Sequence, residues 1–502
     1  IIKRWNLQIK PEDVEKYKRG ELVEPVNPIR VYFDGTFSAT LRESASRGVE
    51  EWNRCFEQAG FKNVLQVQVG EPEVGIAYHQ IVYSYILGAS RQTVICDTRT
   101  GEILSASVCL SNQEWNDNSD AYTMQLGGYE PKVFTDSLPT LYAEYYRYRT
   151  SNTLGQVLGL FSNLTGSMAF TTKQLRDAAW VRENGISSSV TDGCIFNFVA
   201  QPGDGMSLRD LTSKASVYDR WAIEWGYRYF GDTKTIDEEQ KYLREWVTAQ
   251  RKANPRVFFG TETDKWDPRF QSEDLSDDAI AANELGMRNL KMIMENLESW
   301  TAEVDDENYA LMKELYNAVL GQYLRYVMHA MKYVGGRYSD AALRSEGMSK
   351  FTPVEKEKQQ AAMAFLKKYF FQEVPWLYNC RVSQLVSDNI DVYISRVTSK
   401  LMPMVMTEIT NMLKDEEYNG NKAYTVQNLM DDLYDGIWKC MNTKNKLSAH
   451  ERMVQNAYLF VASVIVEDGP IDVAPEMTDM YAVQLEKIGT QAKKRAAVTT
   501  DS

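Results

Sequence analysis

Hydrophobic and polar residues follow two different periods along the chain, and the change of period divides it into two parts. In the first part, five short runs are rich in β-branched and aromatic residues, at 29–33, 64–69, 81–86, 93–96 and 103–110. Runs of this kind, bounded by turn residues, are typical of strands. Between the first two runs, Val49, Trp52, Phe56 and Ala59 recur at helical spacing. This spacing predicts an amphipathic helix over 41–59.

The remaining elements are predicted from turn residues and from helical periodicity. The hexapeptide DTRTGE after the fourth run predicts a hairpin turn, and the polar stretch 112–140 predicts a surface loop. A further helix is expected at about 138–158. From about residue 268, apolar residues recur at helical spacing, which predicts helices at 274–299, 306–334, 353–371 (starting at Pro353), 382–413, 426–441 and 449–466.

The helix expected at 138–158 runs into the segment NTLGQVLGLFS at 152–162, which fits the frame of a known metal-binding motif. The long zincin motif is H-E-x-x-H-x-x-G-x-x-H. Asn152, Thr153, Gln156 and Ser162 stand where it has His, Glu, His and His, and Gly159 alone matches. The segment therefore has the spacing of the motif without its chemical groups.

The chemistry of the motif depends on the groups that are missing. Two His four residues apart on a helix can bind one Zn²⁺, and the Glu beside the first acts as general base. The glycine allows a sharp turn that brings the third His back to the metal. Neutral amides and a serine hydroxyl are poor zinc ligands, and a threonine does not titrate near neutral pH. These residues predict that no zinc is bound and that no hydrolysis occurs.

A simpler interpretation of the same segment is the end of an ordinary amphipathic helix. Leu154, Val157, Leu158 and Phe161 lie at the spacing of one buried face, and Gly159 would then be a helix stop. The segment alone does not separate the two interpretations, so the decision depends on other parts of the chain.

Several downstream and upstream segments resemble a bacterial family of large, zinc-dependent metallopeptidases of the metzincin type. The longest are SSVTDGCIFNFVAQPGDG at 188–205 and YDRWAIEWGYR at 218–228. Further similar segments are IKRWNLQ near the start, PIRVYFD at 28–34, EEWNRCFEQAGFKN at 50–63, DTRTGEIL at 97–104, GQYLRYV at 321–327 and FTPVEKEKQQAAMAFL at 351–366. They follow the family's order and extend over most of the chain.

The resemblance also identifies a second site segment, the methionine-containing turn that lies beneath the metal in such peptidases. Here that turn is 189–193. Ser189, Val190 and Asp192 match the family pattern, whereas Thr191 replaces the Met and Gly193 replaces a Tyr. The resemblance thus implies a scaffold that keeps its surrounding segments and lacks its metal ligands, its general base and its methionine.

The resemblance implies an α+β fold, with a zincin-like domain of mixed sheet and active-site helix followed by a mainly α-helical C-terminal domain. The predicted divisions are 1–135, 136–267 (the motif helix, the degenerate turn and the next segment) and 268–502. The function expected is that of an inactive peptidase homologue that binds a peptide or protein. Two alternatives stay open: an active metallopeptidase with an atypical metal site, and a structural partner with a closed cleft. The family is exported, which implies a periplasmic, cell-surface or secreted protein.

Other candidate chemistry in the chain is sparse. The three histidines, His79, His329 and His450, lie far apart in the sequence, and the six cysteines form no C-x-x-C pair. Cys194 follows the degenerate turn and is expected to be a buried, inert thiol. Asp192 and Glu183 flank the turn and could bind a cation, but acidic residues near turns are more often caps.

Composition excludes some partners and leaves others open. The net charge of −13 argues against nucleic acid, which requires a basic surface. The apolar run AYLFVASVIV at 457–466 is too short to span a bilayer, and a buried helix explains it. Because the sequence starts at Ile1 and not at Met, we expect that something upstream was removed. The ligand and the oligomeric state stay open.

Overall fold

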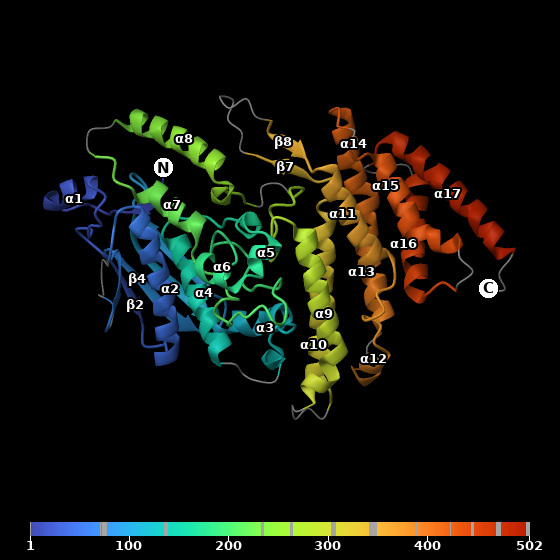
Figure 1. Cartoon of the computed structure of the whole chain (residues 1–502), viewed down its shortest axis with the longest axis horizontal. Coiled ribbons are helices and arrows are strands. Elements are labelled where there is room, and N and C mark those ends of the chain that lie inside the picture. Colours follow the sequence, from blue (N-terminus) through green and yellow to red (C-terminus); the bar gives the residue numbers. More distant parts are fainter. Residues whose placement is uncertain are drawn as a thin grey trace. The chain divides into compact units, whose positions relative to one another are not determined.

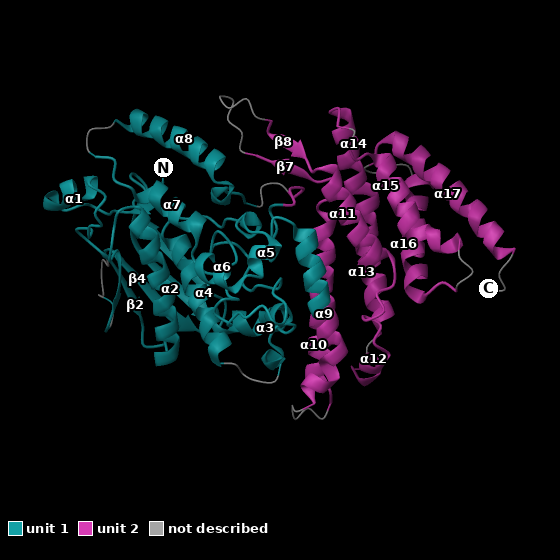
Figure 2. Cartoon of the chain, viewed as in Figure 1, with its two compact units in different colours: residues 1–263, 269–289 teal, residues 264–268, 290–502 magenta. Residues whose placement is uncertain are grey.

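The computed structural model describes residues 2–70, 72, 78–134, 139–231, 235–261, 265–302, 308–340, 349–386, 389–421, 423–442, 446–467 and 473–497, and every structural statement below refers to these residues. The chain runs through the elements drawn in Figure 1. It divides into two compact units, shown in Figure 2: unit 1 is Ile1–Thr263 with Arg269–Asn289, and unit 2 is Asp264–Pro268 with Leu290–Ser502.

Unit 1 contains a mixed sheet built from the runs that the sequence analysis assigned to strands. Its strand order is β1-β6-β4-β2-β3, with all neighbours parallel, and β5 pairs antiparallel with β6. The strands are β1 (Arg4–Trp5), β2 (Ile29–Phe33), β3 (Leu65–Gln68), β4 (Gln80–Ile86), β5 (Arg91–Cys96) and β6 (Glu102–Ser111). Val31 lies beside Ile81, which lies beside Ala106, and all three are buried. The predicted strands and the turn at DTRTGE are confirmed.

Two helices of unit 1 pack against each other at close range. They are α2 (Ala39–Gln58) and α4 (Pro139–Val157), which lie side by side in Figure 1. A methyl group added at Gly48 would lie 2.5 Å from the carbonyl oxygen of Arg147, so α2 approaches the backbone of α4 directly. The indole N–H of Trp52 donates to the carbonyl of Ser151 at 2.8 Å. The helix predicted at 138–158 is confirmed, and α2 fixes its position.

The prediction of a surface loop over 112–140 is wrong. Residues Asn112–Leu126 form helix α3, and the hydroxyl of Ser111 accepts from the backbone N–H of Gln113 as its N-cap. The segment is rich in Asn, Asp and Ser, which have low helix propensity, but tertiary packing overrides this preference. Tyr122, Met124 and Leu126 are buried. Residues 135–138 of the predicted loop lie outside the described residues.

Two further helices of unit 1, α7 (Val217–Tyr227) and α8 (Ile236–Ala253), each begin with a capping box. The box of α7 is formed by Ser216 and Asp219. Helix α8 has a similar box from Thr235 and Glu238. Because none of its residues is buried, α8 lies on the surface of its unit.

Unit 2 is mainly helical, as predicted, with one short hairpin. Its elements are the C-terminal part of α9 (Ala279–Thr301), then α10 (Ala310–Met331), β7 (Arg337–Ser339), β8 (Phe351–Pro353), α11 (Lys356–Leu366), α12 (Cys380–Val386), α13 (Ile390–Met404), α14 (Thr410–Tyr418), α15 (Val426–Leu433), α16 (Ala449–Glu467) and α17 (Pro475–Ala496). Pro353 ends strand β8 and does not start a helix, because the helix begins at Lys356. No described helix is apolar over the length needed to cross a bilayer.

Candidate functional site

The three helical positions of the degenerate motif lie in the last turns of α4, and Gly159 follows the helix. Gly159 has φ +98°, a left-handed conformation that favours glycine. A methyl group added there would lie 2.2 Å from the carbonyl oxygen of Lys3, which precedes β1. The chain therefore turns sharply at Gly159 and passes close to the start of the sheet, as the motif requires.

The degenerate turn at 189–193 lies directly beside α4. A methyl group added at Gly155 would lie 2.8 Å from the side-chain methyl carbon of Thr191, so this residue of the turn packs against the helix between two motif positions. The hydroxyl of Thr191 accepts from the N–H of Asn163 at 3.2 Å and donates to the carbonyl of Phe161 at 3.3 Å. Ser162 lies between these two residues. The fold thus brings the helix, the turn and the third ligand position together.

Asn152, at the first ligand position, is a buried link between the helix and the turn. Its amide nitrogen Nδ2 donates to the carbonyl of Val190 at 2.9 Å, and its Oδ1 accepts from Nη1 of Arg149 at 3.2 Å. The side chain is 6% exposed. Both ends of this amide are therefore occupied by groups of the protein itself.

Arg149 places a permanent positive charge beside the first ligand position. Its Nη2 pairs with the carboxylate of Glu114 in α3 at 2.9 Å, and Glu114 also accepts from the hydroxyl of Ser90 at 2.8 Å. Burial opposes the charged form of Arg149, but the attraction of Glu114 and of nearby tyrosines together outweighs it, so the pKa of the guanidinium is raised. The sequence analysis missed this pair. No motif contains it, and because it joins residues 35 positions apart on two helices, no local spacing indicates it.

Thr153 and Gln156, at the other two helical positions, also form hydrogen bonds with groups of the protein. The hydroxyl of Thr153 donates to the carbonyl of Arg149 at 2.7 Å, one turn back along α4. The Oε1 atom of Gln156 accepts from Nε2 of Gln92 in β5 at 2.6 Å, at the surface. Thr153 is therefore a helix-bonded hydroxyl, and Gln156 connects the helix to the edge of the sheet.

Phe161 and Ser162 are exposed, and the exposure of Phe161 contradicts one detail of the alternative interpretation as a plain helix end. Leu154, Val157 and Leu158 are buried, but Phe161 is 77% exposed. The left-handed turn at Gly159 ends the helical register, so the expected i, i+7 partner faces solvent. Ser162 is exposed beside it.

Two buried carboxyl groups hold the degenerate turn in place. Asp219 in α7 accepts from the hydroxyl of Ser189 at 2.6 Å and from the backbone N–H groups of Val190 and Ser216 at 2.8 and 2.9 Å. Asp192 accepts from the N–H of Ser167 at 2.7 Å. Burial raises the pKa of each carboxyl to about 7. Sequence reasoning missed Asp219, although its spacing from Ser216 resembles that of a capping box.

The remaining candidates have structural surroundings. His79 is buried in unit 1, whereas His329 and His450 belong to unit 2, where His450 contacts the hydroxyl of Tyr378 at 3.0 Å. Cys194 is buried, and burial followed by the charge of Asp192 raises the pKa of its thiol, so its reactive thiolate form is disfavoured. Glu183 is exposed at the end of helix α6 (Ala178–Asn184). In the described ranges, no three His, Cys, Asp or Glu side chains cluster as a metal site would need.

The groups at the motif positions do not fit a zinc ion. A zinc site is formed by imidazole, thiolate or carboxylate groups. Asn152, Gln156 and Ser162 offer two amides and a hydroxyl, and the Arg149 guanidinium bonded to Asn152 would repel a cation. No catalytic step through a metal follows from these residues.

Strand β5 forms an edge of the sheet next to the motif helix. It pairs with β6, and within the described part of the chain no other strand pairs with it. Most of its residues are exposed, including Ile95 at 55%. The side chain of Gln92 projects from β5 to Gln156 of α4. The structure thus places a strand with an unpaired backbone edge beside the helix that carries the motif positions.

A family model described as Met-zincin matches residues 136–445, a range that contains α4, the degenerate turn and most of the helical unit. No curated protein matches the chain, and no solved structure matches it. The match was obtained over well more than half of the chain, and it includes every motif position discussed above.

Proposed function

This protein belongs to the Met-zincin family, and from that premise we propose that it is an inactive member that binds extended peptide segments along the edge of β5. The relationship to metallopeptidases explains why a helix, a glycine turn and a second turn come together in this way. The residues at those positions then decide what the scaffold can do.

The observation that supports inactivity most strongly is the state of Asn152. Its amide bonds to the carbonyl of Val190 on one side and to the guanidinium of Arg149 on the other. A metal ligand must direct a lone pair at an ion and must not be engaged by a neighbouring cation. A general base is also missing, because the hydroxyl of Thr153 does not titrate near neutral pH and donates within its own helix.

The observation that supports peptide binding is the unpaired edge of β5. An extended peptide can add to such an edge through main-chain hydrogen bonds, a mode of binding that needs no metal. Exposed side chains along β5, such as Ile95, would contact alternate side chains of the bound segment. An exposed edge strand without a partner also invites self-association, so a defined occupant would be an advantage to the protein.

The first experiment measures metal content and proteolysis on the same purified sample. We expect well under one zinc per chain by elemental analysis and no cleavage of fluorescently labelled casein, an unfolded protein. One equivalent of zinc that disappears in Gln156→Ala would refute the proposal and favour the active alternative with an atypical site.

The second experiment tests the edge of β5 with a pair of variants, Thr93→Pro and Val94→Pro. In an antiparallel edge strand, neighbouring residues direct their N–H groups to opposite sides, so one variant removes an outward N–H and the other removes a bond to β6. Proline is tolerated where the N–H faces solvent. We expect the variant that keeps its melting temperature to lose casein binding.

The closed-cleft alternative, a structural partner, gives a different result in the same experiment. Asn152 and Thr191 fill the space around the motif positions with the protein's own groups, which is the observation in its favour. If casein does not bind the unmodified protein, or binds equally to the stable proline variant, peptide capture by β5 is excluded and the structural role is favoured.

A further inference from the structure

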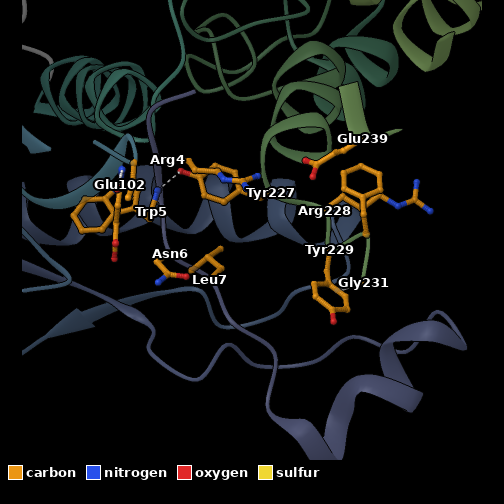
Figure 3. Close-up of a pocket in the computed structure, with 12 residues that line it drawn as sticks. Arg4, Trp5, Asn6, Leu7, Glu102, Tyr227, Arg228, Tyr229, Gly231 and Glu239 are labelled. Carbon is orange, nitrogen blue, oxygen red and sulfur yellow. Dashed lines mark hydrogen bonds between the residues drawn. The ribbon is translucent and has the colours of Figure 1, made fainter. Parts of the chain in front are cut away.

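A pocket of about 280 Å³ lies in unit 1 where β1, β6, the end of α7 and the first turn of α8 meet. Figure 3 shows the side chains that line it. No position of the degenerate motif or of strand β5 lines it, so it is separate from the site of the proposed function. Its volume is at the lower end of the range for small-molecule sites, which fits a ligand of about the size of an amino acid.

The back wall of the pocket is rigid. Trp5 and Tyr227 are 1% and 6% exposed. The indole N–H of Trp5 donates to the carbonyl of Val157, and the hydroxyl of Tyr227 donates to the carbonyl of Leu158, at 2.9 and 2.8 Å. The hydroxyl of Tyr227 also accepts from the backbone N–H of Trp5. The wall is thereby attached to the C-terminal end of α4, and it does not have to be ordered when a ligand binds.

Opposite charges face each other across the pocket. In Figure 3 the guanidinium of Arg4 and the carboxylate of Glu239 point toward one another. Arg4 donates through Nη1 to the carbonyl of Gly226 at 2.7 Å, which fixes its position and leaves its other N–H groups for a ligand. Among the described residues, neither Arg4 nor Glu239 takes part in an ion pair.

A second carboxylate, that of Glu102, belongs to the lining, which carries two arginines and two glutamates. Glu102 lines the pocket and accepts from the hydroxyl of Tyr78. The other guanidinium of the lining, that of Arg228, points away from Arg4 in Figure 3 and pairs with Glu224 at 2.9 Å. The groups available to a ligand are therefore one guanidinium and two carboxylates, an arrangement that favours a ligand with one carboxylate and two cationic groups.

We propose that this pocket binds a basic amino acid, or a short peptide that begins with one. The ligand's carboxylate pairs with Arg4, its α-ammonium group with Glu239, and its cationic side chain with Glu102. Because Glu239 belongs to α8, which has no buried residue, the ligand also ties the first turn of that helix to β1.

The test is calorimetric titration of the full chain with L-arginine and with two analogues that each lack one group. Agmatine has no carboxylate, and Nα-acetyl-L-arginine has no α-ammonium group. Each lost charge-assisted contact should weaken binding by about tenfold or more. Since all three ligands are titrated against the unmodified protein, this comparison does not depend on the folding of any variant. Equal binding of the three, or no saturable binding of L-arginine, overturns the proposal.

Two variants with matched controls locate the site. Glu239→Gln and Arg4→Gln should each weaken L-arginine binding by about tenfold. Glu245→Gln and Arg244→Gln, at exposed positions of the same helix that do not line the pocket, should bind as the unmodified protein does. Hydrogen exchange adds an independent measurement: L-arginine should slow exchange in the first turns of α8, and Glu239→Gln should abolish this effect. Unchanged affinity in both pocket variants, or unchanged exchange in α8, contradicts the assignment.

Discussion

Two layers of residues around the motif positions differ in how their polar groups are used. We call the inner layer the floor; it consists of Asn152, Thr153 and the turn 189–193. We call the outer layer the rim; it consists of Gln92, Ile95, Gln156, Phe161 and Ser162. Floor residues are mostly buried and form hydrogen bonds within the fold, whereas Ile95, Phe161 and Ser162 are exposed. The buried motif positions therefore serve packing and hydrogen bonding within the fold, whereas the rim positions face solvent.

The comparison predicts that floor substitutions destabilise the protein far more than rim substitutions. The largest effect is expected for Asp219→Ala, which leaves the hydroxyl of Ser189 and the backbone N–H groups of Val190 and Ser216 without their acceptor. Each buried donor without a partner costs about 1–3 kcal/mol, so the loss is on the order of 4 kcal/mol. Hydrogen exchange of the backbone amides in 189–193 measures this loss of stability for unit 1 alone. The exposed Asp117→Ala should change it by less than about 0.5 kcal/mol.

The second effect concerns the turn that separates floor from rim. Gly159→Ala combines a left-handed backbone with a methyl group 2.2 Å from the carbonyl oxygen of Lys3. Gly203→Ala is a matched control, because Gly203 has φ +96° but nothing within 4 Å of the added methyl. The control should cost about 1 kcal/mol through the backbone alone, and Gly159→Ala about 3 kcal/mol. Equal losses in thermal unfolding would show that the close approach to Lys3 does not constrain the turn.

The third prediction uses the raised pKa of Asp219. The folded carboxyl titrates at about 7, above its ordinary value, because burial disfavours its charged form. Its contribution to stability is therefore complete at acidic pH, below the ordinary value, and is lost as the pH rises through 7. Asp219→Asn replaces the protonated group with a neutral isostere that does not titrate. Between pH 5 and pH 8 the unmodified protein should lose on the order of 2–3 kcal/mol relative to this variant. A difference that is independent of pH would contradict burial as the dominant influence on this carboxyl.

The sequence predicted the architecture better than it predicted the site. Strands such as β2 and β4 were correctly identified because they are short runs rich in β-branched and aromatic residues, and helix α4 was identified as the helix that carries the motif frame. The resemblance to a metzincin-type family is confirmed. Helix α3 was missed because tertiary burial stabilises a segment of low helix propensity. That Asn152, Gln156 and Ser162 cannot bind zinc stays a prediction, although the fold brings their segments together around Thr191.

What the sequence could not supply were the partners of each polar group. The pair of Arg149 with Glu114 joins residues 35 positions apart, on two helices, of which one was not predicted. Asp219 reaches the turn from a helix 29 positions downstream of Val190. Such contacts depend on how elements pack, and no local spacing encodes them. The residues at the motif positions could therefore be read from the sequence, whereas their hydrogen-bond partners could be read only from the structure.

The fourth prediction asks whether the floor still has the geometry of a metal site. We expect Asn152→His, Thr153→Glu, Gln156→His and Ser162→His together to restore zinc binding only weakly. The guanidinium of Arg149 is bonded to the first of these positions and would repel the ion. Adding Arg149→Leu should tighten zinc binding by about tenfold or more, measured by competition with a chelating dye. Failure of both variants to bind zinc, with folding intact by circular dichroism, would show that the scaffold no longer positions three ligands.

The smallest effect is expected at the rim, where Gln156 meets Gln92. Their hydrogen bond of 2.6 Å lies at the surface, so water replaces either partner when it is removed, and Gln156→Ala should cost less than about 0.5 kcal/mol. Asn152→Ala, one turn earlier on the same helix, leaves the buried carbonyl of Val190 without its donor and should cost about 2 kcal/mol. Both positions stand where the zincin motif has histidines, so thermal melts of the pair compare floor and rim directly. Equal losses of stability would mean that floor and rim residues contribute alike to folding. The distinction between a buried floor and a rim available to a partner would then be wrong.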